Sequence, residues 1–256
     1  MDWGRAKTVL ILSFLLLNAL LGYQLFINRD QAGGQSDAAR VKEDTLKLLE
    51  VKQIQLKVES IPKQTPKLRA FYYKEVLNAQ EPVELSEPIG SGTLIGRNVL
   101  KAEMEKAGIV NYDRYRIDAS TSKPGMKVYD QLHDDLPIFD VSLVLLEDNN
   151  KITGYKQTYV EVQSGGESKE QKVISAYTAL RSVAENSLKN DSVVTDIRLG
   201  YHGQRFESDT QYMLPSWRIV LASGEIFYVQ AFSGAVEKPA ESPSATPAVV
   251  VPTSAP

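Results

Sequence analysis

The sequence predicts an α+β protein: an N-terminal transmembrane helix followed by an extracellular domain of antiparallel sheets with helices packed across them. Three observations lead to this fold class. Residues 8–27 form an uncharged, apolar run. Beyond that run, several strand-like segments follow single helical ones, whereas a parallel α/β fold would alternate strand and helix. The last twenty residues, 237–256, contain five prolines, which sets them apart from the domain at 38–236.

The apolar run has the length of a membrane span. Twenty helical residues cover about 30 Å, the thickness of the hydrocarbon core of a bilayer. Tyr23–Ile27 offers no pair of small residues at which a signal peptidase could cut, so we expect an uncleaved anchor at residues 8–27. The density of basic residues before the run predicts a cytoplasmic tail at residues 1–7 and an extracellular remainder. A short Gly- and Ser-containing hinge is expected at residues 28–37.

Periodicity gives the elements of the first half of the domain. Apolar residues recur every three or four positions in an amphipathic helix and every second position in a half-buried strand. Gly90, Gly92 and Gly96 indicate turns between the two kinds of segment. The expected order is a helix with Val41, Thr45, Leu48 and Leu49 on its apolar face, strands at 54–58 and 68–76, a helix at 98–106 and a strand at 112–117.

The second half is expected to be richer in strands. Residues 137–146 and 152–162 flank the polar sequence EDNNK and predict a long antiparallel hairpin. Ser168 and Gln171 fit a capping box at the start of a helix over 169–188. Three strands follow at 193–201, 217–222 and 225–231, the last two joined by a two-residue turn at Ser223-Gly224.

The order of elements suggests an internal duplication. Residues 38–76 are expected to form a helix followed by two strands, and residues 169–231 a helix followed by three strands. Each group would form one lobe with a helix across an antiparallel sheet. The domain is therefore expected to consist of two related lobes. The proline-rich segment 237–256 cannot bury enough apolar surface to form a core, so we expect it to be disordered.

Composition removes most classes of enzyme. The chain has no cysteine, which excludes disulfides, thiolate metal sites and thiol catalysis, and it has only two histidines. Its net charge of −3 disfavours nucleic acid as a partner. Asp130, His133, Asp134 and Asp135 could supply metal ligands, but a solvated turn before Pro137 explains them better.

Nucleotide and serine-hydrolase motifs are also missing. Gly165-Gly166 precedes the expected helix without the lysine of a P-loop, and the sequence contains no G-x-S-x-G motif. Asp148, Asn150 and Gly154 resemble a calcium loop, but Ile152 occupies a ligand position. We therefore predict no catalytic residue, no metal site and no cofactor.

The apolar run contains an unusual set of small and polar residues. Ser13, Asn18 and Gln24 carry polar side chains, and Gly22 lies one helical turn after Asn18. In hydrocarbon, side-chain amides favour hydrogen bonds to another helix, and small residues allow close approach. These four residues are the predicted contacts with partner transmembrane helices. The alternative is that a strongly apolar helix simply tolerates one asparagine.

Several segments resemble one bacterial family. The chain begins with Met1-Asp2-Trp3, Arg5 and Lys7 followed by LILSFLLLNALLGYQL, which is similar to the start of the YycI proteins of Gram-positive bacteria. Tyr155–Thr158 and the segment FYVQAFSG at 227–234 resemble the same family. The resemblance covers roughly residues 1–236. The Tyr-Val-x-Ala-Phe-x-Gly ending also resembles small secreted PepSY-type sheets.

The resemblance implies a regulator rather than an enzyme. Proteins of this family are single-pass membrane proteins that act with YycH on the sensor histidine kinase YycG, also called WalK, largely through transmembrane helices. That two-component system controls cell-wall metabolism, so the implied partners are the kinase, a YycH-like protein and the lipid bilayer. Two other classes stay open from the residues alone: an extracellular module that binds a wall polymer or a peptide, and an unrecognised hydrolase.

Overall fold

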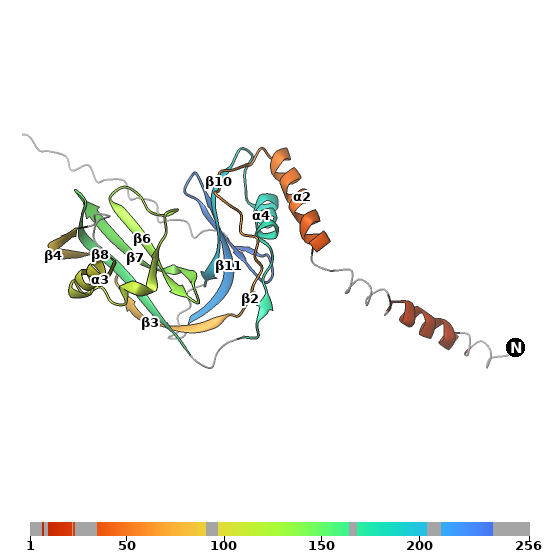
Figure 1. Ribbon diagram of the computed structural model, residues 1–256. Coiled ribbons are helices and arrows are strands. Elements are labelled where there is room, and N and C mark those ends of the chain that lie inside the picture. The colour runs from red at the N-terminus through yellow and green to blue at the C-terminus, as the bar shows by residue number, and fades with distance from the viewer. Residues whose placement is uncertain are drawn as a thin grey trace, which may run out of the picture. The chain divides into compact units, whose positions relative to one another are not determined.

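The computed structural model describes residues 7, 10–21, 23, 35–90, 97–163, 168–203 and 211–237. The chain forms two compact units, Met1–Lys47 and Leu48–Pro256. Figure 1 shows the helices and strands along the chain. The predicted residues Gly22 and Gln24, residues 28–34 of the expected hinge and residues 238–256 of the expected tail lie outside the described residues. Of the same two segments, residues 35–37 belong to a helix and Glu237 belongs to a strand.

The first unit is helical wherever it is described. Residues 10–21 form a helix, and its leucines and Phe14 are about half exposed or more. The helix α2 begins in this unit and runs from Gln35 to Val51, which confirms the helix expected around Val41. Within the described ranges, no helix combines the length and the apolar character needed to cross a bilayer. The transmembrane assignment of residues 8–27 stays a prediction.

The second unit is α+β, as the sequence predicts. The hairpin around EDNNK is confirmed, and its turn residues Asn149 and Asn150 have φ values of 49° and 60°, as a two-residue hairpin turn requires. The helix expected at 98–106 is confirmed as α3. The elements are α3 (Arg97–Lys106), η1 (Tyr112–Arg114), α4 (Ala176–Asn186) and strands β1 (Gln55–Leu56), β2 (Lys67–Leu68), β3 (Phe71–Asn78), β4 (Val83–Gly90), β5 (Tyr115–Ile117), β6 (Met126–His133), β7 (Leu136–Asp148), β8 (Lys151–Val162), β9 (Gln171–Lys172), β10 (Val193–His202), β11 (Gln211–Leu221), β12 (Ile226–Gln230) and β13 (Val236–Glu237).

The predicted start of the C-terminal helix is wrong. The helix α4 begins after Ser175, whose side chain accepts a hydrogen bond from the backbone N–H of Thr178. Ser168, expected to be the cap, instead accepts a hydrogen bond from the backbone N–H of Ala70 at 2.9 Å. Gln171 and the residue after it form β9 and pair with β2. Long-range backbone hydrogen bonds therefore compete successfully with the local helical pattern.

Three other expectations need correction. The strands β4 and β6 were not expected, and residues 112–117 divide into η1 and β5. The loop between β11 and β12 has three residues rather than two, because Leu221 N–H donates to the carbonyl of Glu225 across Ala222, Ser223 and Gly224. Gly224, at φ 90°, supplies the left-handed residue of this loop.

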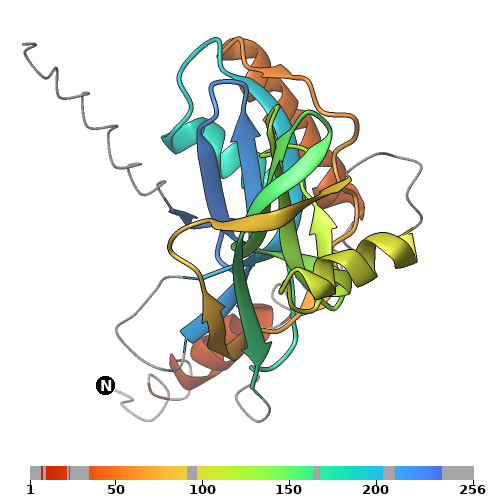
Figure 2. The ribbon, with the colours of Figure 1, turned by 90° about the vertical axis from the view of Figure 1, so that its left-hand side faces the viewer.

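Most strands belong to one mixed sheet whose middle closes on itself. The sheet order is β1-β10-β11-β3-β8-β7-β6-β5, and Tyr201 of β10 also pairs with Ile138 of β7 in a parallel bridge. This extra bridge joins β10, β11, β3, β8 and β7 into a closed ring of strands. Figure 2 shows the strands crossing one another in the middle of the molecule.

The backbone pairing between β7 and β8 ends at Leu143 and Gln157, and beyond that point a side chain of β6 bonds to β8 instead. The register between β6 and β7 shifts after Asp130, which frees Phe139 and its neighbours from β6. Gln131 then reaches across to β8, where its Nε2 donates to the carbonyl of Val160 at 2.7 Å and its Oε1 accepts from the Val160 N–H at 3.0 Å. Gln131 is only 4% exposed, so these bonds satisfy a buried amide.

Three apolar clusters fill the second unit. The C-terminal core gathers residues of α4, β10, β11 and β12, the hairpin core gathers residues of α3, β4, β5, β7 and β8, and the ring core lies among the five closed strands. The ring core consists of Phe71, Tyr73, Ile138, Val141, Val160, Tyr201 and Met213. Leu49 and Ile54 belong to the C-terminal core. The expected division into an N-terminal and a C-terminal lobe is therefore wrong, because elements from both ends of the domain share one core.

A glycine permits the ring to close. A Cβ atom at Gly200 would lie 2.4 Å from the carbonyl oxygen of Pro137 and 2.6 Å from the ring of Phe139. Both neighbours belong to β7, next to the bridge between Tyr201 and Ile138. The closure therefore depends on the missing side chain at residue 200.

We predict that Gly200→Ala destabilises the full chain by about 1–3 kcal/mol, because the backbone carbonyl of Pro137 cannot move away without opening the ring. Urea unfolding in detergent measures the loss. Gly224→Ala is the matched control, because nothing lies within 4 Å of its Cβ position and the cost is limited to the positive φ. A smaller loss at residue 200 than at residue 224 would contradict this account of the closure.

Candidate functional site

The sequence-predicted contact residues lie on the N-terminal helix where they are described. Ser13 and Asn18 belong to the helix at 10–21 and are exposed. Asn18 Nδ2 donates to the backbone carbonyl of Phe14 at 3.0 Å, one turn earlier in the same helix. The amide donor therefore has a partner within its own helix. Gly22 and Gln24 lie outside the described residues, so the four predicted contacts stay a prediction.

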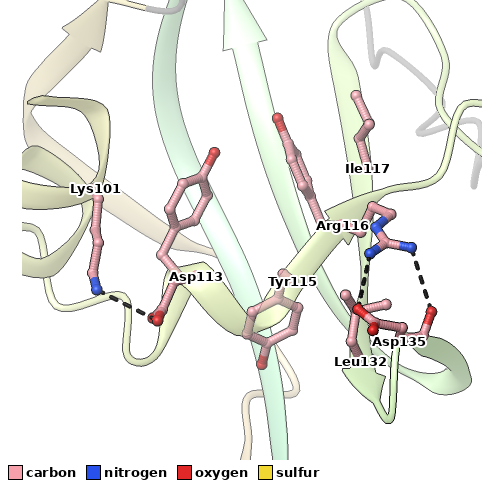
Figure 3. Close-up of a pocket in the computed structure, with 9 residues that line it drawn as sticks. Lys101, Asp113, Tyr115, Arg116, Ile117, Leu132 and Asp135 are labelled. Carbon is pink, nitrogen blue, oxygen red and sulfur yellow. Dashed lines mark hydrogen bonds and ion pairs between the residues drawn. The ribbon is translucent and has the colours of Figure 1, made fainter. Parts of the chain in front are cut away.

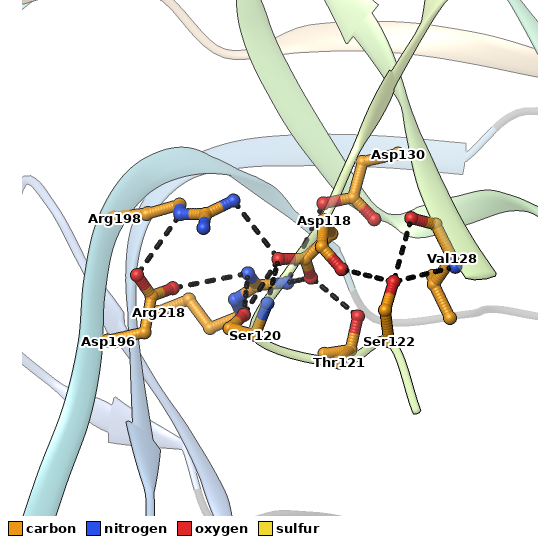
Figure 4. A network of polar contacts seen from close by, with 9 residues as sticks. All are labelled: Asp118, Ser120, Thr121, Ser122, Val128, Asp130, Asp196, Arg198 and Arg218. Carbon is orange, nitrogen blue, oxygen red and sulfur yellow. Dashed lines mark hydrogen bonds and ion pairs between the residues drawn. The ribbon is translucent and has the colours of Figure 1, made fainter. Parts of the chain in front are cut away.

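A larger concentration of charge is buried in the domain. Arg218 lies in the middle of β11 and is 2% exposed. Its guanidinium faces Asp118, which follows β5, and Asp130 on β6. Figure 4 shows the carboxylates and hydroxyls around it. One sequence signal exists for this cluster: an arginine interrupts the otherwise apolar run WRIVLA at residues 217–222.

Asp118 is the closest partner of Arg218. Arg218 Nη1 lies 2.8 Å from Asp118 Oδ2 and 3.6 Å from Asp130 Oδ2, and Nη2 lies 3.4 Å from Asp196 Oδ2. Nη2 also donates to Ser120 Oγ at 2.9 Å. The guanidinium thus connects β11 with β6, β10 and the segment after β5.

A second arginine completes the cluster. Arg198 of β10 donates from Nη1 to Asp118 Oδ1 at 3.0 Å and from Nε to Asp196 Oδ1 at 3.1 Å. Asp118 also accepts from the hydroxyls of Ser120 and Thr121 at 2.7 and 2.6 Å. Asp118 is fully buried, and these bonds offset the loss of its hydration. We call Asp118, Asp130, Asp196, Arg198 and Arg218 the charge cluster.

The two buried aspartates of the charge cluster have opposite protonation behaviour. Burial raises the pKa of Asp118, but the charge of Arg218 and hydrogen bonds from Arg218, Thr121 and Ser120 outweigh it and lower that pKa to about 2. Burial and the charge of Asp118 raise the pKa of Asp130 to about 7, against the attraction of Arg218 and Arg198. Three carboxyl groups share two guanidinium groups, and Asp130 is the one whose negative charge is least well compensated, so it takes up a proton most readily.

An aromatic ring covers the guanidinium of Arg218. The centroid of the Phe139 ring lies 4.4 Å from Arg218 Cζ. Nε of Arg218 is buried and, among the described residues, is the only such side-chain nitrogen or oxygen without a hydrogen-bond partner. Phe139 is the residue that the missing side chain of Gly200 accommodates. Ring closure and burial of Arg218 therefore depend on the same contact.

A histidine lies at the end of β10, close to the last described strand. The imidazole of His202 stacks on Tyr228 with a centroid distance of 3.7 Å and an interplanar angle of 9°. Its Nδ1 lies 2.8 Å from Asp140 Oδ1 and its Nε2 lies 3.4 Å from Glu237 Oε2. Burial raises the pKa of Tyr228 above its ordinary range. His202 thus links β7, β10 and β13.

The acidic sequence before Pro137 was only partly understood from the sequence. Asp134 and Asp135 form the expected turn, with φ values of 48° and 63°. Asp130, by contrast, is buried in the charge cluster. His133 ends β6, and its ring centroid lies 4.3 Å from that of Phe71. His133 Nε2 also lies 3.6 Å from Asp134 Oδ2, whereas Asp130 faces Arg218 and Asp135 pairs with Arg116, so the four residues do not form one common site.

The charge cluster has the properties of a structural joint. Its carboxylates face arginines and hydroxyls, and Asp118 and Asp130 are 0% and 3% exposed. A hydrolase would need carboxylates that reach a substrate. In the described ranges, no group of three His, Asp or Glu residues is arranged to hold a metal ion. The arrangement can hold β5 and β6 against β10 and β11, which is a positional role.

Comparisons with known proteins identify a family over most of the domain. The family model described as YycI protein matches residues 40–232. No curated protein matches the chain.

Two solved structures are similar at low identity. One is an uncharacterized protein from Eubacterium rectale, with 10% identity, a TM-score of 0.39, and coverage of 80% of this chain and 82% of that one. The other is the C-terminal domain of Bacillus megaterium YpeB, with 14% identity, a TM-score of 0.34, and coverage of 61% and 70%.

Removing the carboxylate of Asp118 should destabilise the protein strongly. Asp118→Asn leaves Arg218 without its closest anion, and we expect a loss of about 3–5 kcal/mol of unfolding free energy. Asp130→Asn is the matched control: it makes the same chemical change beside the same guanidinium. It should cost less than about 1 kcal/mol near neutral pH, because that carboxyl is already partly protonated. Chemical unfolding of the full chain compares the two, and equal losses would contradict the assignment of charge.

The charge cluster also predicts a pH dependence. The pKa of Asp130 is raised to about 7 in the folded state, so the folded protein binds more protons than the unfolded chain between about pH 4 and pH 7. Stability should therefore fall as pH rises through this window. In Asp130→Asn, the loss of stability that comes from the ionisation of Asp130 should be absent. Unfolding free energies of both proteins at about pH 4.5 and about pH 7.5 test the prediction, and identical pH slopes would refute it.

Proposed function

The chain belongs to the YycI family, and we propose that it is a membrane-anchored, non-enzymatic regulator of a YycG-type sensor histidine kinase. The observation that carries the proposal is the family match over residues 40–232, which includes most of α2, all of α3 and α4, and the strands β1 to β12. The YycI family is a regulatory family of the YycG kinase system. We infer that this protein acts together with a YycH-like partner in a two-component system for cell-wall metabolism.

The N-terminal helix supports a membrane location for the regulator. Residues 10–21 expose leucines, an isoleucine and Phe14 around the helix, with exposed fractions from 49% to 73%. So much exposed apolar surface favours a lipid or protein environment over water. We propose that residues 8–27 cross the cell membrane once, with the N-terminus in the cytoplasm and the domain outside.

We propose that Ser13, Asn18, Gly22 and Gln24 contact the partner helices within the membrane. The hydrogen bond from Asn18 to the carbonyl of Phe14 limits what the amide can add. An amide whose donor is partly satisfied within its own helix gains less from a cross-helix bond. Gly22, one turn further along, would contribute by allowing close approach of another backbone. Asn18 is therefore expected to determine how the partner helix is oriented more than to increase the affinity between the helices.

A helix exchange tests the proposal. We replace residues 8–27 by an unrelated membrane helix of the same length. The output of the kinase is measured with a reporter gene, and the association of the protein with the kinase is measured by energy transfer in membranes. Regulation should be lost, while the domain stays folded and exported. Within the native helix, Asn18→Leu should weaken association by about 0.6 kcal/mol, and Leu16→Val on the opposite face should have no effect. Full regulation by the exchanged protein would reject the transmembrane mechanism.

A further inference from the structure

A pocket of about 540 Å³ lies beside β5, at the end of the sheet order. Its apolar part includes Tyr112 and Tyr129, whose ring centroids are 6.0 Å apart, together with Ile117. Ile117 is 46% exposed, so its side chain is accessible to a ligand in the pocket. The volume and aromatic lining are typical of ligand sites in proteins.

Two ion pairs border the pocket. Lys101 Nζ lies 3.4 Å from Asp113 Oδ2, and Arg116 Nη2 lies 3.4 Å from Asp135 Oδ1. Figure 3 shows one pair on each side of Tyr115. Both pairs are exposed to water and contribute little to stability, so their members can exchange partners with a ligand. The lining carries equal numbers of positive and negative groups, which disfavours a polyanion and suits a segment that carries both charges.

The strand β5 offers backbone groups toward the pocket side. Asp118 N–H donates to the carbonyl of Val128, which makes Ile117 and Tyr129 the non-hydrogen-bonded pair of this antiparallel ladder. The N–H and C=O of Ile117 therefore point away from β6. Within the described ranges, no strand pairs with this edge of β5. An open strand edge accepts an extended peptide through main-chain hydrogen bonds.

We propose that this pocket and the β5 edge bind an extended peptide segment of a partner protein. The segment pairs with Ile117 and places one apolar or aromatic side chain against Tyr112 and Tyr129, while its charged groups meet the two ion pairs. This inference goes beyond the proposed function, because it adds a contact on the domain that is separate from residues 8–27. The next residue after β5 is Asp118, so the binding strand leads directly into the charge cluster.

Single cysteines can report on occupancy, because the natural chain contains none. Asp113→Cys places a thiol at the pocket, and Val99→Cys places one on the exposed face of α3 as a control, since Val99 is 58% exposed and does not line the pocket. Each full-length variant is labelled with a maleimide in membrane fragments of its own cells and again after purification into nanodiscs. We expect Asp113→Cys to react about fivefold more slowly in the native membranes, as when about four-fifths of the sites are occupied, and Val99→Cys to react equally in both.

A proline in the edge strand tests the binding mode. Ile117→Pro removes the outward N–H and leaves the β5–β6 hydrogen bonds intact, which edge strands tolerate. Added to Asp113→Cys, it should restore the fast labelling seen in nanodiscs. Thermal unfolding and the unchanged rate of Val99→Cys show that the variant is folded; if it is not, Ile117→Glu, which puts a charge at the apolar mouth, replaces it and should give the same result.

Three outcomes would overturn the proposal. Equal labelling of Asp113→Cys in membranes and nanodiscs would show an empty site. If neither Ile117→Pro nor Ile117→Glu restores fast labelling of Asp113→Cys, the molecule that covers the pocket does not pair with the edge of β5. Protection that disappears after muramidase digestion would identify a wall glycan as the occupant instead of a peptide. Kinase output is not used as a readout, so failure here is distinguishable from failure of the transmembrane mechanism.

Discussion

The fold depends on the close approach of β10 to β7 at Gly200. Only a residue without a side chain lets the backbone of β10 reach Pro137 and the ring of Phe139. That approach allows the bridge between Tyr201 and Ile138, which closes five strands into a ring and encloses the ring core. It also holds Phe139 over Arg218. One steric constraint thus fixes the ring, its core and the cover of the charge cluster.

The charge cluster is the polar counterpart of this closure. A lone arginine in a buried strand would be costly, but Arg218 meets carboxylates from Asp118, Asp130 and Asp196, which come from three different parts of the domain. These charged hydrogen bonds require a defined geometry. They therefore fix the position of β11 relative to the segments that carry the aspartates, whereas apolar packing alone would allow these segments to shift. A rigid joint between the two sides of the sheet preserves the relative position of the surfaces of the domain. The pocket beside β5 lies one residue from this joint.

Local patterns in the sequence were sufficient for some elements and not for others. The hairpin β7–β8 and the helix α3 follow from periodicity and from turn residues such as Asn149 and Asn150. The predicted start of α4 was wrong because Ser168 accepts a hydrogen bond from the backbone N–H of Ala70, a residue almost a hundred positions earlier. The partners of Arg218 could not be predicted, because they depend on a ring closure that no local pattern encodes; only the arginine within an apolar strand indicated a buried charge. Of the predicted contact residues, Asn18 was identified as unusual, but its hydrogen bond to Phe14 lies within its own helix.

The central claim is that the closure makes the hairpin core and the C-terminal core one cooperative unit. Native-state hydrogen exchange of the full chain tests it most directly, because it reports the opening free energy of each amide. Leu143 and Leu145 represent the hairpin core, and Ile219 and Leu221 the C-terminal core. Our account predicts that the slowest amides of both cores open with the same free energy and the same dependence on denaturant. Exchange of one core through an opening of lower free energy, while the other core stays protected, would contradict it.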